Sequence, residues 1–328
     1  MSVRPIFLLS LPRTGSTLVQ RVLGAHERVA TASEPWLMLP FLYAQRERGA
    51  QADYGHFAAA QAIQDFARSL PGGLADYDRE LADFARRLYA LSAGEGATYF
   101  VDKNPRYHLV VDELTRLFPD AKLVFLWRNP LATLGSLLET FVGGRFAPYE
   151  FTLDLYGGVD RLTRAWQDHG ADAIAVGFER LVHGEEEWRR LFGYLELDFD
   201  PAVLSRFSDL RLPGRFGDPT GVERYAEISE EPLDKWRSSL AGGVRTAWTR
   251  RWLRWIGADR MATMGYDLEA LLADLQTTPP SNRSSAVDAL QLLASRLRHE
   301  RRRRALALDP ARRRAMSSPP PAPPQRCS

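Results

Sequence analysis

An apolar run near the start of the chain, followed at once by a tight polar loop and a helical pattern, constrains the fold more than any other segment. Residues 4–11 are mostly apolar and are bounded by Pro5 and Pro12, which predicts a short buried strand. After the loop 12–17, apolar side chains recur at helical spacing as far as Gly24. Strand, loop and helix in this order open a βαβ unit, so we expect a parallel sheet.

Further strands and helices alternate along the chain. Apolar runs predict three more strands, at 98–101, 122–127 and 173–178. Helical patterns fall between and after them, at 108–118, from Pro130 onward and at 185–195. This alternation is typical of an α/β fold, in which a parallel sheet is flanked by helices.

The segment from about 40 to 95 is expected to be a helical insertion in this fold. Ala-rich windows at 57–70 and 77–91 have helical character, and the sequence Pro71-Gly72-Gly73 separates them. No strand pattern interrupts them, so we expect an added helical layer.

The C-terminal segment differs in charge from the rest of the chain. Residues 296–328 contain ten arginines and two acidic residues, whereas residues 1–295 contain 33 basic and 39 acidic residues. The body is therefore not predicted to bind nucleic acid. We expect a domain at 1–275, followed at 276–328 by a basic helix and a Pro-rich, partly disordered tail. The charge of this tail suits weak contact with a membrane surface or an acidic partner.

Cysteine content and apolar runs bear on the compartment. Cys327 is the one cysteine of the sequence, so we expect neither a disulfide framework nor a four-thiolate metal site. The apolar run 6–11 is too short to span a membrane and lacks the length and cleavage site of a signal peptide. The expectation is a soluble cytoplasmic protein.

The loop after the first strand carries the residue types of an anion site. A loop that opens a helix directs backbone N–H groups at a ligand, and the helix dipole favours negative charge. Gly15 permits close approach, Ser16 and Thr17 add hydroxyls, and Arg13 adds a planar fork that matches phosphate or sulfate oxygens. The nucleotide-hydrolase pattern needs an earlier Gly and a Lys that this loop lacks. A plain Ser/Thr helix cap is the structural alternative.

A second anion site is predicted at the end of the strand 122–127. Arg128 follows this strand directly, at the end where open α/β sheets bind ligands. Ser136 lies two helical turns later, which brings its hydroxyl back toward the strand end. A salt-bridged Arg and a surface Ser would give the same pattern. Two anion sites on neighbouring strands suit a nucleotide phosphorylated at both ends, so we expect a P-loop-like nucleotide-binding core.

Five short motifs resemble those of the sulfotransferases in order and rough spacing, over about residues 4–200. They are Leu11-Pro12-Arg13-Thr14-Gly15-Ser16-Thr17, Ser33-Glu34-Pro35, Asp102-Lys103-Asn104-Pro105, Trp127-Arg128-Asn129-Pro130 with Ser136, and Phe178-Glu179-Arg180-Leu181. The resemblance implies 3′-phosphoadenosine 5′-phosphosulfate as co-substrate and no metal. It also implies which residues bind each end, with the 5′-phosphosulfate held by Arg13, Thr14, Gly15, Ser16 and Thr17, and the 3′-phosphate by Arg128 and Ser136.

The sequence departs from the cytosolic small-molecule members of that family at one place. Their catalytic His, two residues after a Lys, corresponds here to Pro105, and His108 falls three residues later. The chain instead resembles the protein-tyrosine and carbohydrate branch, in which a Glu after the first helix serves as base. The resemblance thus implies Glu34 as general base. We expect Lys103, one of three lysines, to stabilise charge on the leaving nucleotide.

Other interpretations remain open from the sequence. Glu34 could instead brace a turn, Glu179 is expected to brace the fold, and His26, His108 or Trp36 could line an acceptor site. A P-loop kinase-like phosphotransferase and a non-catalytic nucleotide-binding scaffold are the competing functions. The acceptor is expected to be a hydroxyl or amine of a small molecule, a glycan or a peptide, and the sequence does not specify which.

Overall fold

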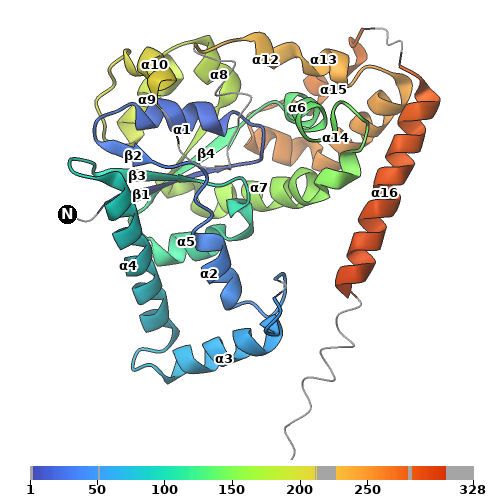
Figure 1. Ribbon diagram of the computed structural model, residues 1–328. Helices are drawn as coiled ribbons and strands as arrows, with labels where there is room; N and C mark the ends of the chain where they lie inside the picture. The colour runs from blue at the N-terminus through green and yellow to red at the C-terminus, as the bar shows by residue number, and fades with distance from the viewer. Residues whose placement is uncertain (1–2, 51, 211, 213–226, 280–282, 308–328) are drawn as a thin grey trace, which may run out of the picture.

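The computed structural model describes residues 3–50, 52–210, 212, 227–279 and 283–307 (Figure 1). Its α-helices are α1 (Ser16–Gly24), α2 (Met38–Ala44), α3 (His56–Ser69), α4 (Leu74–Ala93), α5 (Val111–Leu117), α6 (Pro130–Val142), α7 (Val159–His169), α8 (Phe178–His183), α9 (Glu186–Tyr194), α10 (Val203–Arg206), α12 (Glu231–Asp234), α13 (Trp236–Ser239), α14 (Gly243–Thr263), α15 (Leu268–Gln276) and α16 (Ser285–Ala307). Shorter helical turns are η1 (Tyr107–Leu109), η2 (Pro148–Phe151), η3 (Leu153–Gly158), η4 (Gly170–Asp172) and η5 (Phe207–Asp209). The predicted Pro-rich tail and Cys327 lie outside the described residues.

Five parallel strands form one sheet at the centre of the molecule (Figure 1). The sheet consists of β1 (Arg4–Ser10) in the middle, β3 (Tyr99–Lys103) and β4 (Lys122–Trp127) beside it, and β2 (Val29–Thr31) and β5 (Ala173–Gly177) at the edges. The expected α/β fold with a helix-flanked parallel sheet is confirmed. Because the strands are parallel, β1, β3 and β4 end on the same side of the sheet, where α/β proteins bind ligands.

The side chains of β1 alternate between two hydrophobic cores. Ile6 and Leu8 belong to the core that α1 and α9 cover, whereas Phe7 and Leu9 belong to the core that α4, α5 and α7 cover. Burial on both faces explains why this strand is a continuous apolar run in the sequence rather than an alternating one.

The predicted helical insertion is present as α2, α3 and α4, of which α3 and α4 project from the sheet (Figure 1). The predicted break between α3 and α4 is also confirmed. Gly73 immediately precedes α4 with φ 64°, a left-handed conformation that glycine adopts without a steric penalty.

Two predicted elements had wrong boundaries, and one strand was missed. The strand 98–101 continues to Lys103, so that this residue ends β3. The helix 108–118 is interrupted, because η1 occupies 107–109 before α5 begins at Val111. The edge strand β2 was missed, since three residues are too few to show a period.

The predicted basic helix is α16, and several of its apolar side chains are exposed. Val287, Leu290 and Leu293 are 49%, 67% and 52% exposed. The opposite face is held by polar contacts, chief among them the buried ion pair of Asp288 with Arg245 on α14. Through these contacts α16 packs against α14 and η2 and runs down one side of the molecule (Figure 1).

Candidate functional site

A cavity of about 1030 Å³ opens where β1, β3 and β4 end. One part of it, referred to below as the strand-end region, is formed by the loop 13–17 with Glu34, Lys103, Arg128 and Ser136. The loop joins β1 to α1, Lys103 ends β3, Arg128 follows β4, and Ser136 lies on α6. The fold therefore brings the predicted site residues into one cavity, with the exception of Thr14, which does not line it.

Gly15 fixes the shape of the loop between β1 and α1. It precedes the first residue of α1 with φ 89° and ψ 13°, in the left-handed region. A Cβ at this position would lie 2.2 Å from the ring of Phe178, which is buried. Both the backbone and the packing therefore require glycine. No side chain among the described residues caps α1, so the Ser/Thr-cap alternative is wrong and the first N–H groups of α1 are available to a ligand.

The three hydroxyl residues of this loop have different surroundings. Ser16 and Thr17 line the cavity, and Thr17 Oγ1 lies 3.5 Å from Lys103 Nζ. Thr14, in contrast, is buried, and its hydroxyl donates a 2.8 Å hydrogen bond to the carbonyl of Leu11. The Thr14 side chain thus stabilises the loop from within and does not face the cavity.

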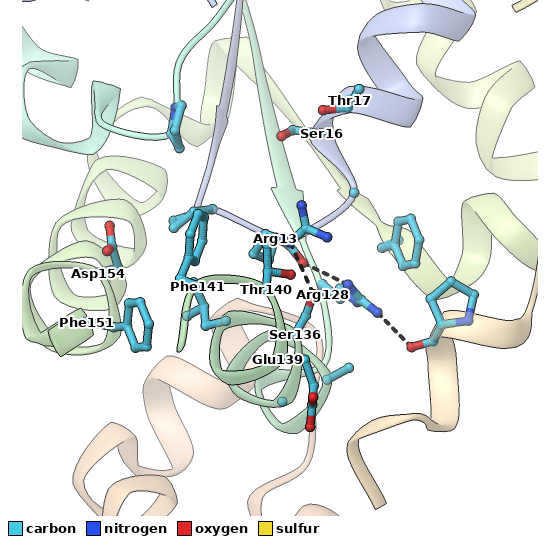
Figure 2. Close-up of a pocket in the computed structure, with 18 of the residues that line it drawn as sticks. Arg13, Ser16, Thr17, Arg128, Ser136, Glu139, Thr140, Phe141, Phe151 and Asp154 are labelled. Carbon is cyan, nitrogen blue, oxygen red and sulfur yellow. Dashed lines mark hydrogen bonds between the residues drawn. The ribbon is translucent and has the colours of Figure 1, made fainter. Parts of the chain in front are cut away.

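Arg13, Arg128 and Ser136 form one cluster (Figure 2). Arg13 Nε donates to Ser136 Oγ at 3.2 Å, and Arg128 Nη1 donates to the Arg13 carbonyl at 2.7 Å. Arg13 has φ 67°, a left-handed conformation that is uncommon outside glycine. The Arg13 side chain reaches across to α6 and lines the same cavity as Ser16 and Thr17, so its expected role at the 5′-phosphosulfate stays a prediction.

Arg128 is held in place by the surrounding backbone and by a ring. It is 8% exposed, and its second terminal nitrogen donates to the carbonyl of Pro232 at 2.8 Å. Its guanidinium lies 4.8 Å from the centre of the Phe178 ring. The Arg128 guanidinium is therefore held in a fixed position by two backbone carbonyls and the Phe178 ring.

Glu34 and Lys103, the two predicted catalytic residues, are an ion pair. Lys103 Nζ lies 2.7 Å from Glu34 Oε1, and the two side chains are 2% and 13% exposed. Trp36 Nε1 donates to the other carboxylate oxygen at 3.3 Å. Both partners and Trp36 line the cavity, so Glu34 does not only brace a turn.

Asp102, next to Lys103 on β3, lies on the opposite face of the sheet. It is fully buried, and the hydroxyls of Tyr89 and Tyr107 each donate to its Oδ2 at 2.6 Å. Burial raises the pKa of Asp102 to about 6, although both hydrogen bonds and Lys103 oppose this shift. Asp102 therefore belongs to the support behind the site.

A second part of the cavity, referred to below as the aromatic region, contains Phe141, Phe151, Arg106 and Asp154. The two rings lie 6.0 Å apart, and Arg106 pairs with Asp154. Figure 2 shows Phe141, Phe151 and Asp154 on one side of the cluster of Arg13, Arg128 and Ser136. The sequence analysis missed this region, because its residues follow no strand and match no motif.

The two histidines considered as acceptor contacts do not line this cavity. His108 is buried with its Nε2 3.6 Å from Asp154 Oδ1, and burial lowers its pKa more than Asp154 raises it. His26 packs against Phe192 instead. Glu179 accepts hydrogen bonds from the Asn129 N–H and the Tyr266 hydroxyl, which confirms its bracing role.

Two further features are absent from the described part of the chain. No group of three or more His, Cys, Asp or Glu residues there is arranged to hold a metal ion. No helix in the same residues is both long and apolar enough to cross a bilayer.

Comparisons with known proteins agree on one family. Residues 5–201 match the model described as the sulfotransferase family. The nodulation protein NoeE of Sinorhizobium fredii is 31% identical over 291 residues, which are 80% of this chain and 65% of that protein. A protein-tyrosine sulfotransferase of Drosophila melanogaster is 25% identical over 253 residues, 73% of this chain and 48% of that protein. The chain thus spans less than two thirds of the length of these curated relatives.

A solved structure supports the fold. The sulfotransferase domain from the curacin biosynthetic pathway superposes with a TM-score of 0.53 at 21% identity, covering 78% of this chain and 98% of that domain. The α/β architecture with its five-stranded parallel sheet is the one that this domain shares.

Proposed function

This chain belongs to the sulfotransferase family, and we propose that it transfers a sulfuryl group from 3′-phosphoadenosine 5′-phosphosulfate to a hydroxyl or amine of an acceptor. The proposal depends mainly on one observation. The cluster of Arg13, Arg128 and Ser136 and the ion pair of Glu34 and Lys103 lie in the same cavity, at the ends of three neighbouring strands. One cavity therefore offers a site for an anion and a pair for proton and charge transfer.

The two ends of the donor would bind to different parts of the strand-end region. The 3′-phosphate would accept hydrogen bonds from Arg128 and Ser136, because charge-assisted bonds from a guanidinium fork suit a tetrahedral anion. The 5′-phosphosulfate would lie over Gly15, Ser16 and the start of α1, where uncapped N–H groups and the helix dipole favour negative charge.

Glu34 would act as the general base. As the acceptor oxygen or nitrogen attacks sulfur, its proton passes to the Glu34 carboxylate, and the bond between sulfur and the bridging oxygen of the 5′-phosphate breaks. The displacement is in line and loose, so the protein contributes mainly positioning and electrostatic stabilisation. Trp36 keeps the carboxylate in place through its hydrogen bond to the second oxygen.

Lys103 would stabilise the negative charge that grows on the bridging oxygen. In the free protein Lys103 is occupied by Glu34, at 2.7 Å. Donor binding offers Lys103 a new anionic partner, and its departure from Glu34 would leave that carboxylate a stronger base. The ion pair thus couples donor binding to activation of the acceptor.

The acceptor would bind in the aromatic region. The rings of Phe141 and Phe151 offer an apolar surface beside the strand-end region, which suits the ring of a sugar or a phenol. We propose a small molecule, a glycan or a peptide as the carrier of the hydroxyl or amine, in keeping with the variety of relatives.

The test combines ligand binding with group transfer. Thermal unfolding of the full chain is measured with adenosine 3′,5′-bisphosphate and, separately, with ATP and magnesium. The proposal predicts stabilisation by the bisphosphate, together with transfer of label from ³⁵S-labelled donor to acceptors in an extract of the cells that make the protein. Stabilisation by ATP and magnesium alone would favour a kinase, and bisphosphate binding without transfer would favour a scaffold.

A further inference from the structure

Two arginines of α16 line the cavity, at its rim next to the aromatic region. Arg298 and Arg302 are four residues apart and therefore lie on the same face of α16. Both pair with Glu150, which immediately precedes Phe151. A helix near the end of the chain thus contributes charge to a cavity that the first 200 residues mostly build.

The charges of this rim do not balance. Arg298 Nε lies 2.6 Å from Glu150 Oε1, and Arg302 Nη1 lies 2.9 Å from Oε2. Arg145 lines the same cavity and donates from Nε to the carbonyl of Val142. The nearest cavity carboxylate along the chain, Asp154, is paired with Arg106. Two guanidinium groups, those of Arg298 and Arg302, therefore share the one carboxylate of Glu150.

The rim pair contributes little to holding α16 in place. Its arginine side chains are 46% and 69% exposed, and exposed ion pairs of this kind contribute little to stability. The helix is anchored elsewhere, by the buried pair of Arg245 and Asp288 and by the hydrogen bond from the Phe146 N–H to Gln291. Helix anchoring therefore does not explain two arginines on one carboxylate.

We propose that Arg298 and Arg302 form a subsite for an anionic group of the acceptor, a carboxylate, sulfate or phosphate, while the ring that carries it lies against Phe141 and Phe151. This inference rests on the proposed function, because it assigns a charge to the acceptor of that reaction. Guanidinium forks bind all three anions through charge-assisted hydrogen bonds. Glu150 holds the two forks beside each other in the free protein and offsets one of their two positive charges.

The test uses one sugar ring with and without charge. Binding of methyl β-D-glucoside, methyl β-D-glucuronide, and the 6-sulfate and 6-phosphate of methyl β-D-glucoside is measured on the full chain saturated with adenosine 3′,5′-bisphosphate. The variants are the double substitution R298Q/R302Q, Glu150→Gln, and Arg303→Gln as matched control, since Arg303 is an exposed arginine of α16 that does not line the cavity.

We expect the charged sugars to bind about three- to tenfold more tightly than the neutral one. R298Q/R302Q should abolish this preference, Glu150→Gln should increase it by about threefold, and Arg303→Gln should leave it unchanged. The three anions differ in size and geometry, so their order of affinity identifies the group that the subsite prefers.

The decisive result is that R298Q/R302Q and Glu150→Gln change the preference for charged sugars in opposite directions. If Glu150→Gln and R298Q/R302Q both weakened charged sugars alike, the three residues would only support the helix. A charged sugar that binds no better than the neutral one, or an equal loss in Arg303→Gln, would also overturn the subsite. Failure of the proposed function is seen separately, as absence of bisphosphate binding in every variant and in the unmodified chain.

Discussion

The strand-end region and the aromatic region share one cavity but are built in different ways. In the strand-end region, Arg128 directly follows a strand and Lys103 ends one, so the sheet itself fixes their positions. In the aromatic region, Phe141 comes from the end of α6 and Phe151 from η2, and the rim beyond them comes from α16. The first region is part of the rigid core, whereas the second is assembled from peripheral elements.

This difference suggests a division of labour. A donor that is the same in every member of the family can be bound by groups fixed on the sheet, where preorganisation is greatest. An acceptor that differs among members can be bound by peripheral elements, because these can change without disturbing the sheet. Substitutions in the strand-end region should therefore affect turnover or donor binding, and those in the aromatic region should affect the acceptor KM.

The largest effect is expected for Lys103→Ala. Loss of the ammonium group removes charge stabilisation at the leaving oxygen, so kcat should fall by about a hundredfold or more, while bisphosphate affinity stays within about threefold. Initial rates with labelled donor and calorimetric titration of bisphosphate measure the two quantities. Lys122→Ala, on β4 and paired with Glu196 outside the cavity, is the control. A variant that loses bisphosphate binding in proportion to kcat would contradict the assignment.

Glu34→Gln should lower turnover by about a hundredfold, because the amide cannot accept the proton of the acceptor. The side chain keeps its size and its amide oxygen can still accept the hydrogen bond from Lys103, while the amide nitrogen cannot accept the one from Trp36, so the thermal unfolding temperature should fall only modestly. Single-turnover rates at saturating donor isolate the chemical step. Near-normal rates would remove Glu34 from the role of base, and Glu113→Gln, whose carboxylate pairs with Arg46, provides the matched control.

Arg128→Gln should weaken bisphosphate binding by about tenfold to a hundredfold, since a charge-assisted fork to the 3′-phosphate is lost. Adenosine 5′-phosphate, which lacks that phosphate, should bind the variant and the unmodified chain with similar affinity. Ser136→Ala should weaken bisphosphate binding by about threefold and should likewise leave the affinity for adenosine 5′-phosphate unchanged. Equal losses for both nucleotides would mean that Arg128 supports the loop through the Arg13 carbonyl rather than binding the 3′-phosphate.

Asp102 lies behind the strand-end region, and Asp102→Asn should change how the free energy of unfolding depends on pH. Because burial raises the pKa of Asp102 from 3.8 to about 6, the folded chain binds this proton more tightly than the unfolded chain. Its contribution therefore favours folding below about pH 4 and is lost as the pH rises through 6. Relative to the unmodified chain, the variant should gain ~1–2 kcal/mol of stability between pH 4 and pH 7.5.

Urea unfolding of both proteins at the two pH values checks this prediction. A stability difference between Asp102→Asn and the unmodified chain that is the same at both pH values would show that Asp102 ionises normally. Circular dichroism at each pH establishes that both proteins are folded before denaturant is added.

The smallest effect is expected in the aromatic region. Phe141→Ala should raise the acceptor KM by about two- to fivefold, because the ring is 58% exposed in the free protein and an acceptor that contacts one side of it would cover only part of that surface. Bisphosphate affinity should stay unchanged, and Phe66→Ala, an equally exposed ring on α3, should have no effect on either quantity. If Phe141→Ala weakened bisphosphate binding instead, the two regions would not divide donor from acceptor.

The sequence predicted the strand-end region well for a physical reason. Buried parallel strands are continuous apolar runs, and the residue after such a run lies at a known end of the sheet. The apolar runs therefore predicted correctly that the loop at 13–17 and Arg128 lie at the ends of neighbouring strands. The sequence could not show the direction of the Arg13 side chain, which depends on a left-handed backbone at that residue, or the inward hydroxyl of Thr14.

The aromatic region and its rim were beyond sequence reasoning because they depend on tertiary contacts. Phe151 and Glu150 lie in a short turn, and Arg302 lies about 150 residues later in a helix whose arginines resemble an ordinary solvated face. The sequence also could not show that Asp288 on α16 forms a buried ion pair with Arg245, because this contact joins two helices about 40 residues apart.

The most direct test of the central claim is a crystal structure of the full chain with adenosine 3′,5′-bisphosphate. The account predicts the 3′-phosphate within hydrogen-bond distance of Arg128 and Ser136, and the 5′-phosphate over the N–H groups that follow Gly15, with Lys103 turned from Glu34 toward it. A bisphosphate bound outside this cavity, or one whose 3′-phosphate contacts neither Arg128 nor Ser136, would contradict the account.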